Sequence, residues 1–282
     1  MQITIAKSAG FCFGVKRALD IAYKATSSGK KIEMLGDIVH NEDVVKQINN
    51  LGIRKISRLS SGRNKTILIR AHGADKKLFK KAVMLGYSII DATCPMVKEI
   101  HKIATDMESK GFKIIIIGDK KHDEVHGIIG QLKNKALVIE HLDKATINKV
   151  KRLKKACVIC QSTQKEEKVL EIVSKIKPFI KEMKFFNTIC MPTRIKQKEI
   201  KSMPLENDLM LIIGSKNSAN TKRLFEISKT LNGNSFWVQS SLDINPKWFQ
   251  GIAKVGITAG ASTPDETTNK IVDRIKQIGK NN

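Results

Sequence analysis

The 282-residue sequence has no long apolar run, few aromatic side chains and little arginine. Its longest strongly apolar run, around residues 114–117, is far shorter than the roughly 20 residues that span a bilayer, so we expect no membrane partner. The N-terminus lacks the continuous apolar segment of a secretory signal, and we expect a cytoplasmic protein. Aromatic residues make up only 5% of the chain, too few for the stacking platforms typical of nucleic-acid-binding proteins.

Positive charge is abundant, but lysine supplies most of it. The formal net charge is +24, and 42 lysines against 9 arginines are spread along the whole chain. Phosphate and base recognition favours arginine forks, so we expect no nucleic-acid partner and interpret most of this charge as a solvated lysine surface. A basic docking face for an acidic protein or an anionic substrate is the second interpretation.

The chain contains five cysteines, an odd number that favours metal binding or thiol chemistry over structural disulfides in a cytoplasmic protein. Cys12, Cys94 and Cys190 each stand where a strand-like pattern changes into a helical one. The N–H groups and the dipole of a helix N-terminus favour a thiolate there. Cys157 and Cys160 lie inside an apolar run, and we interpret them as buried core thiols.

Strand-like runs alternate with helical patterns throughout the sequence, which predicts an α/β fold with parallel sheets. The predicted strands are residues 2–6, 32–35, 66–69, 87–90, 112–117, 156–160, 184–186, 209–213 and 254–257. Cys12, Cys94 and Cys190 are separated by 82 and 96 residues, and 92 residues follow the last of them. We therefore expect three α/β units of comparable size, at 1–95, 96–191 and 192–282, each providing one thiolate to a common centre.

Three distant thiolates can hold a metal centre and leave one coordination position open. This arrangement suits a cubane iron–sulfur cluster whose fourth iron faces a substrate. A zinc site and a cysteine nucleophile are the alternatives that the spacing leaves open.

Polar side chains follow most of the predicted strands, at the edge where open α/β sheets bind ligands. Such donors at helix N-termini predict an anion pocket, with phosphate or diphosphate as the ligand. The residues of this predicted pocket are His40, His72, His122, Ser218, Asn220 and Ser262.

Glu124 lies two residues after His122 and is a candidate proton donor. Thr163, together with Ser162, could relay protons or hold a hydroxyl group. A glutamate exposed in a surface loop is the competing interpretation of Glu124.

Taken in order, these motifs resemble the 4-hydroxy-3-methylbut-2-enyl diphosphate reductases, the enzymes of the last step of the methylerythritol phosphate route to isoprenoids. The resemblance extends from the first residues to about residue 270. The motifs that carry it lie at residues 9–15, 36–41, 71–73, 91–95, 122–125, 214–218 with 220–221, and 258–262.

The resemblance implies a trefoil of three pseudo-symmetric parallel-sheet units around a central 4Fe-4S cluster, which can be isolated in the 3Fe-4S form. Cys12, Cys94 and Cys190 would be its ligands. The family reduces (E)-4-hydroxy-3-methylbut-2-enyl diphosphate with two electrons, removes its hydroxyl group as water, and forms isopentenyl and dimethylallyl diphosphate. Reduced ferredoxin or flavodoxin is the expected electron donor.

The resemblance also assigns roles to single residues. Glu124 matches the proton donor, Thr163 and Ser162 lie in the polar relay segment, and the six pocket residues match the diphosphate ligands. Three positions depart from the usual pattern: Ser162 replaces a threonine, Ala219 a serine and Lys196 an arginine.

Two rival functions come from other classes. A basic RNA- or partner-binding protein with structural zinc would be colourless and would bind nucleic acid in a salt-dependent way. A phosphatase or transferase with Cys12 as its nucleophile would need only one of the three thiols. Iron bound under anaerobic conditions distinguishes the reductase from both.

Overall fold

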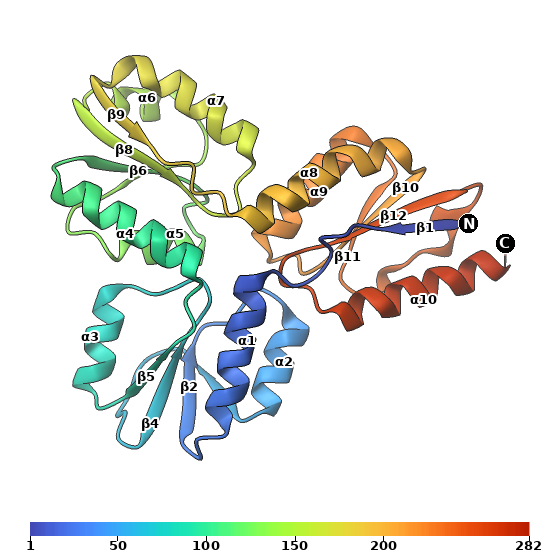
Figure 1. Ribbon diagram of the computed structural model, residues 1–282, viewed down its shortest axis with the longest axis horizontal. Helices are drawn as coiled ribbons and strands as arrows, with labels where there is room; N and C mark the ends of the chain where they lie inside the picture. The colour runs from blue at the N-terminus through green and yellow to red at the C-terminus, as the bar shows by residue number, and fades with distance from the viewer. Residues whose placement is uncertain (282) are drawn as a thin grey trace. The chain divides into compact units, whose positions relative to one another are not determined.

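The computed structural model describes residues 1–281 and contains, within them, three four-stranded parallel sheets joined by helices (Figure 1). The predicted α/β class is therefore confirmed. The chain divides into two compact units. Unit 1 comprises Met1–Lys16, Val39–Val45 and Met191–Asn282, and unit 2 comprises Arg17–Ile38 and Lys46–Cys190.

The first sheet belongs to unit 2 and has the strand order β3-β2-β4-β5. Its central strands β2 and β4 pair in parallel, with Ile32 opposite Thr66. Helices follow β2 and β4, as crossover connections of parallel strands require. In chain order, the elements from α1 to β5 are α1 (Phe13–Thr26), β2 (Lys31–Leu35), α2 (Glu42–Asn50), β3 (Ile53–Ile56), β4 (Lys65–Ile69), α3 (Lys76–Met84) and β5 (Ser88–Asp91), and the first turns of α1 and α2 belong to unit 1.

The second sheet also belongs to unit 2, in the order β7-β6-β8-β9. Its centre is covered by helices on both faces, which explains why β6 is a continuous run of isoleucine rather than an alternating pattern. The elements are α4 (Pro95–Ser109), β6 (Lys113–Ile117), α5 (Asp123–Ile129), β7 (Leu137–Ile139), α6 (Lys144–Val150), β8 (Lys155–Cys160), α7 (Glu166–Ile176), the 3-10 turn η1 (Lys177–Phe179) and β9 (Glu182–Phe185).

The third sheet lies in unit 1 and has the order β1-β12-β10-β11. Its inner strands β10 and β12 are buried apart from Lys254, and they pack against helices that include α10. The elements are β1 (Gln2–Ile5), α8 (Met191–Glu206), β10 (Leu209–Ile213), α9 (Ala219–Leu231), β11 (Ser235–Val238), η2 (Ser241–Asp243), η3 (Pro246–Phe249), β12 (Lys254–Ala259) and α10 (Asp265–Asn281).

The position of β1 corrects one part of the predicted domain organisation. The predicted boundaries place residues 1–95 in the first unit, but β1 pairs in parallel with β12, and Ile3 lies opposite Val255. The alternation of residues 2–5 identifies a strand but carries no information about its partner. The remaining boundaries, near residues 95 and 191, stay predictions.

The three sheets repeat one strand order once β1 is counted last in its sheet. The sheets β3-β2-β4-β5, β7-β6-β8-β9 and β11-β10-β12-β1 then correspond strand by strand, and the third is a circular permutation of the others. A Cβ atom on Gly279 would lie 3.0 Å from Cε of Met1, so the last turns of α10 lie beside the start of β1. Helix α10 is therefore the counterpart of α3 and α7, which connect the third strand to the fourth strand in the other two sheets. It follows the third strand, β12, and ends beside the start of the fourth, β1 (Figure 1).

Across residues 1–281, no helix combines the length and the apolar character needed to cross a membrane.

Candidate functional site

The three cysteines predicted as ligands follow the fourth strand of their respective sheets: β1, β5 and β9. All three are partly buried thiols. Each backbone N–H donates to the carbonyl oxygen two residues beyond the end of the neighbouring third strand. These hydrogen bonds join Cys12 to Ala261 at 3.1 Å, Cys94 to Ala71 at 3.0 Å and Cys190 to Ser162 at 3.1 Å.

Each of these cysteines directly precedes a helix. Cys94 is the N-cap residue of α4 and Pro95 occupies the first turn, as predicted. The carbonyl oxygen of Cys12 accepts the N–H of Lys16 at 3.0 Å and so begins the hydrogen-bond ladder of α1. A helix N-terminus stabilises negative charge, so the three positions suit thiolate ligands of a metal centre.

Other predicted site residues also occupy equivalent positions. The first strands of the sheets end at residues 35, 117 and 213, and the third strands at residues 69, 160 and 259. Some of the predicted site residues lie at the same number of positions after these strand ends, and this shared spacing is a signal that the sequence already contains. The fifth residues after the first strands are His40, His122 and Ser218, and the third residues after the third strands are His72, Thr163 and Ser262.

Two of the predicted histidines meet in unit 2. The ring centroids of His72 and His122 are 5.6 Å apart in an edge-to-face arrangement. The neighbouring side chains form an ion pair, with Nη1 of Arg70 2.6 Å from Oδ2 of Asp123. Nδ1 of His122 accepts the backbone N–H of Glu124 at 3.1 Å, so the neutral ring carries its proton on Nε2.

Glu124 is not an exposed loop residue, because only 2% of its surface is accessible. The backbone N–H of Ser162 donates to its Oε1 and the hydroxyl of Ser162 donates to its Oε2, both at 2.6 Å. Burial raises the pKa of this carboxyl group, and the two hydrogen bonds from Ser162 act in the opposite direction. A carboxyl group that favours its neutral form can hold a proton for transfer.

The segment after β8 connects this carboxyl group to one of the predicted ligands. Ser162, rather than Thr163, contacts Glu124 directly, and the carbonyl oxygen of Ser162 accepts the N–H of Cys190. The hydroxyl of Thr163 accepts a hydrogen bond from the Gln161 side chain at 3.0 Å. Thr163 therefore belongs to the same polar segment as Ser162.

The remaining predicted pocket residues belong to unit 1. The hydroxyl of Ser262 donates to the carbonyl oxygen of His40 at 3.1 Å, and Oδ1 of Asn220 accepts the N–H of Ala261 at 3.0 Å. Ser218 is the N-cap residue of α9. Nδ2 of Asn220 is buried and has no hydrogen-bond partner within residues 1–281, so its N–H groups are available for an anionic ligand.

Cys157 and Cys160 are buried core thiols, as predicted. Both are fully buried, and they pack into different hydrophobic clusters because the pleat of β8 directs them to opposite faces of the sheet. Burial raises the pKa of Cys157 to about 12 and also raises the pKa of Cys160. They cannot act together as ligands of one ion.

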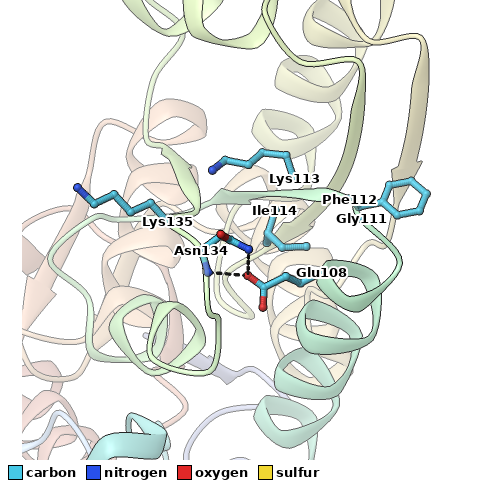
Figure 2. A pocket seen from close by; sticks show the side chains of 7 residues that line it. All are labelled: Glu108, Gly111, Phe112, Lys113, Ile114, Asn134 and Lys135. Carbon is cyan, nitrogen blue, oxygen red and sulfur yellow. Dashed lines mark hydrogen bonds between the residues drawn. The ribbon is translucent and has the colours of Figure 1, made fainter.

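A cavity of about 280 Å³ lies elsewhere in unit 2 (Figure 2). Lys113 and Ile114, the first residues of β6, help to line it. The cavity therefore lies at the N-terminal ends of the strands, whereas the predicted site residues follow the C-terminal ends. The carboxylate of Glu108 in this cavity already accepts the backbone N–H groups of Lys133 and Asn134. None of the predicted site residues lines it.

Comparison with known proteins identifies the family. The model of the LytB protein family matches residues 3–276. The chain belongs to the LytB family. This membership confirms the resemblance predicted from the motifs, because the curated relatives of this LytB chain have the name of that reductase.

Two relatives show how far the similarity extends. The 4-hydroxy-3-methylbut-2-enyl diphosphate reductase of Aquifex aeolicus (strain VF5) is 38% identical over 282 residues, covering 99% of this chain and 97% of the relative. The enzyme of the same name from Pelobacter propionicus (strain DSM 2379 / NBRC 103807 / OttBd1) is 37% identical, with full coverage of both chains.

Two solved structures share the fold. A structure of (E)-4-hydroxy-3-methyl-but-2-enyl diphosphate reductase, described as the terminal enzyme of the non-mevalonate pathway, is 38% identical with a TM-score of 0.74, covering 98% of this chain and all of the other. The E-1-hydroxy-2-methyl-but-2-enyl-4-diphosphate reductase from Plasmodium falciparum has a TM-score of 0.88 at 26% identity, covering 96% and 87%.

Three polar residues of these regions were not predicted as functional from the sequence. Arg70 and Asp123 form the ion pair beside the two histidines. Lys196, noted only as a departure from the family pattern, is a buried cation. The only local signal for the first two is a charged residue within two positions of a motif histidine, and nothing in the local pattern signals the third.

Proposed function

We propose that this LytB chain catalyses the reaction named for its relatives, the reductive dehydroxylation of (E)-4-hydroxy-3-methylbut-2-enyl diphosphate. The carbon–oxygen bond of the allylic alcohol breaks, two electrons and two protons enter, and water leaves. The products are isopentenyl and dimethylallyl diphosphate. The observation that carries the proposal is the set of three thiols at equivalent helix N-termini, together with a buried carboxyl group that is linked to one of them, Cys190, through hydrogen bonds of Ser162.

Cys12, Cys94 and Cys190 would hold one 4Fe-4S cluster, which can be isolated in the 3Fe-4S form. Their fit rests on the donor chemistry: three partly buried thiols, each positioned by the same backbone hydrogen bond at a helix N-terminus that favours the thiolate. When bound, such a cluster supplies electrons and one iron without a protein ligand for the substrate hydroxyl.

The diphosphate would be held by the six predicted pocket residues. His122 can donate from Nε2, because its Nδ1 accepts the N–H of Glu124. Asn220 offers its buried Nδ2, which has no partner among the described residues. Hydrogen bonds to a charged acceptor are among the stronger polar contacts, which suits the multiply charged diphosphate end of the substrate. The full set is His40, His72, His122, Ser218, Asn220 and Ser262.

Glu124 would supply a proton to the reacting end of the substrate. Its burial favours the protonated carboxyl group, and Ser162 fixes both of its oxygen atoms. Thr163 would hold the hydroxyl of the substrate or pass protons towards it, from the same segment after β8. Reductive removal of a hydroxyl group needs such a donor, because hydroxide is a poor leaving group.

The electron donor would be an acidic carrier such as reduced ferredoxin or flavodoxin. The net charge of +24 favours association with an acidic protein, and steering of this kind weakens as ionic strength rises. We therefore expect the rate with such a carrier to fall as salt is added, whereas the rate with a small reduced dye should change much less. Equal salt dependence for both donors would argue against electrostatic docking.

The proposal is tested by anaerobic purification, iron and sulfide analysis, and an assay with dithionite-reduced dye and the allylic diphosphate. We expect bound iron and sulfide and the two isoprenoid diphosphates as products. Replacement of Cys12, Cys94 or Cys190 by serine should abolish the cluster, whereas Cys157→Ala is the matched control that keeps it. A chain that binds zinc but no iron, or that keeps its cluster without Cys94, contradicts the proposal.

A further inference from the structure

Lys196 is a buried cation in the second turn of α8. Only 2% of its surface is accessible, which is unusual for a lysine. Its ammonium group donates to three backbone carbonyl oxygens of unit 1, those of Ser8, Gly10 and Ala259, the last two at 3.0 Å. These contacts occupy all three donors of an ammonium group.

The three carbonyl groups belong to the two chain segments that position Cys12. Ser8 and Gly10 precede this cysteine, and Ala259 is the last residue of β12, two residues before Ala261, whose carbonyl oxygen accepts the N–H of Cys12. Lys196 therefore connects the segment that carries the thiol to the strand end that anchors it. No other strand end in unit 1 contacts this ammonium group through a hydrogen bond within the described residues.

A second residue of α8 holds the same loop. The backbone N–H of Ser8 donates to Oε2 of Glu199 at 3.1 Å, and the hydroxyl of Ser8 donates to the same oxygen. Gly10 has a φ of +89°, and a Cβ atom there would come within 2.5 Å of Oδ1 of Asp265. The loop before Cys12 thus has a fixed path that other side chains at Gly10 would disturb.

Two opposing effects act on the charge of Lys196: burial disfavours the charged form, and nearby negative groups favour it. Burial lowers the pKa of Lys196 to about 8, and the negative charges of Cys12, Glu199 and Asp265 act in the opposite direction. A positive charge in a poorly solvated site interacts more strongly with a nearby negative group than it would in water. Lys196 can therefore act on Cys12 both through the backbone and through its charge.

We propose that Lys196 is a positioning residue for Cys12, which fixes the loop carrying this thiol and stabilises negative charge on it and on the cluster it would bind. This inference rests on the proposed function. The reduced form of a cluster carries one more negative charge than the oxidised form, so a nearby buried cation favours reduction. Removing the charge should lower the midpoint potential.

Lysine and arginine are not equivalent at this position. An ammonium group is a compact centre whose three donors can point to three converging carbonyl oxygens, whereas the guanidinium group is a larger planar fork. Lys196→Arg therefore keeps the charge and alters the hydrogen bonds. Lys196→Gln keeps hydrogen-bond donors and removes the charge, and Lys196→Met removes both.

The experiment compares these variants with Lys198→Met, which removes an exposed lysine from the same helix. Iron and sulfide are measured for each anaerobic preparation, and the midpoint potential is measured by dye-mediated redox titration. In Lys196→Gln we expect the ratio of reduced to oxidised cluster at a fixed potential to fall at least tenfold, which corresponds to about 59 mV for a one-electron couple. Lys198→Met should change that ratio less than twofold.

We expect Lys196→Met to lose at least half of the bound iron, and Lys196→Arg to retain the potential better than Lys196→Gln. Circular dichroism identifies any variant that does not fold, and Lys196→Gln then decides the question. Wild-type potential and iron content in both Lys196→Gln and Lys196→Met overturn the inference while leaving the proposed function intact. A wild-type chain that binds no cluster overturns both.

Discussion

Glu124→Gln removes the proposed proton donor and leaves its shape almost unchanged. Glu124 is 2% accessible, and its two oxygen atoms lie 2.6 Å from N and Oγ of Ser162. In the variant, the amide oxygen can accept the same backbone N–H, and the serine hydroxyl can rotate to accept a hydrogen bond from the new amide. We therefore expect the variant to fold and to bind cluster and substrate.

The effect on turnover follows from the role of a general acid. Such a group typically contributes a factor of about 10² to 10⁴ in rate, which corresponds to about 2.7 to 5.4 kcal/mol in activation free energy. We expect kcat of Glu124→Gln to fall by about this factor while KM changes little. The substrate contacts proposed for the diphosphate lie on other side chains, so uniform binding should be preserved.

The same substitution should change how stability depends on pH. Burial raises the pKa of Glu124 in the folded chain, so its contribution to stability is fully present below the unfolded value of about 4.3 and is lost as pH rises through the folded value. Each unit of the upward shift corresponds to about 1.4 kcal/mol of that loss. Glutamine cannot ionise, so Tm of the variant minus Tm of the wild type should increase as pH rises from 4.

The assay is anaerobic steady-state turnover with a dithionite-reduced dye, with iron content measured on the same samples. Glu171→Gln is the matched control, since Glu171 is an exposed residue of α7 whose side chain pairs with Lys175. A kcat of Glu124→Gln within threefold of the wild type, with intact cluster, would refute the role as proton donor. Parallel Tm curves against pH would refute the reasoning about burial.

Three further predictions concern the surrounding residues. Arg70→Met and Asp123→Asn should each raise KM about five- to tenfold and change kcat less than threefold. The reason is that this partly exposed ion pair aligns the segments of His72 and His122, with a coupling energy of about 1 kcal/mol. The double variant should therefore have a KM no higher than that of either single variant. Cys157→Ala and Cys160→Ala should lower Tm and leave iron content unchanged, since both thiols are fully buried in apolar clusters. Asn220→Asp keeps the acceptor for Ala261 but loses the unpaired N–H groups, so calorimetry with isopentenyl diphosphate should show affinity reduced about tenfold or more.

Local patterns in the sequence predicted most strands and the placement of the ligand cysteines at helix starts. Such features depend on neighbouring residues only, for example the apolar run before Pro95 and the helical spacing after it. The strands β3, β7 and β11 were not predicted. All three are the outer strands next to the first strand of their sheets, and short edge strands carry a weak pattern, as the three residues of β7 illustrate.

Contacts between distant segments could not be predicted in the same way. The sequence predicted Thr163 and Ser162 together as a relay segment, without indicating which of them contacts Glu124; the pairing of β6 with β8 brings Ser162 to the carboxyl group. Arg70 and Asp123 are 53 positions apart in the sequence, after the ends of β4 and β6, and only the tertiary fold brings them together. The periodicity of apolar residues indicates which face of an element a residue occupies, but it does not indicate which distant residue that face contacts.

The repeated strand order places Asn220 at the position equivalent to Glu124, so the structural role of the carboxyl group can be separated from its role as a proton donor. Glu124 and Asn220 are both the seventh residue after the first strand of their sheets. Each side chain accepts the backbone N–H of the second residue after the third strand, Ser162 for Glu124 and Ala261 for Asn220. In both sheets the carbonyl oxygen of that second residue accepts the N–H of a predicted ligand cysteine.

An amide therefore already performs, in the third sheet, the structural task that the carboxyl group performs in the second. The hydrogen bond that orders the segment needs only an oxygen acceptor, and both side chains provide one. What Asn220 cannot do is carry an exchangeable acidic proton. The natural asparagine at the equivalent position thus supports the expectation that Glu124→Gln will keep the local structure, and it assigns the loss of turnover to the missing proton rather than to a displaced cysteine.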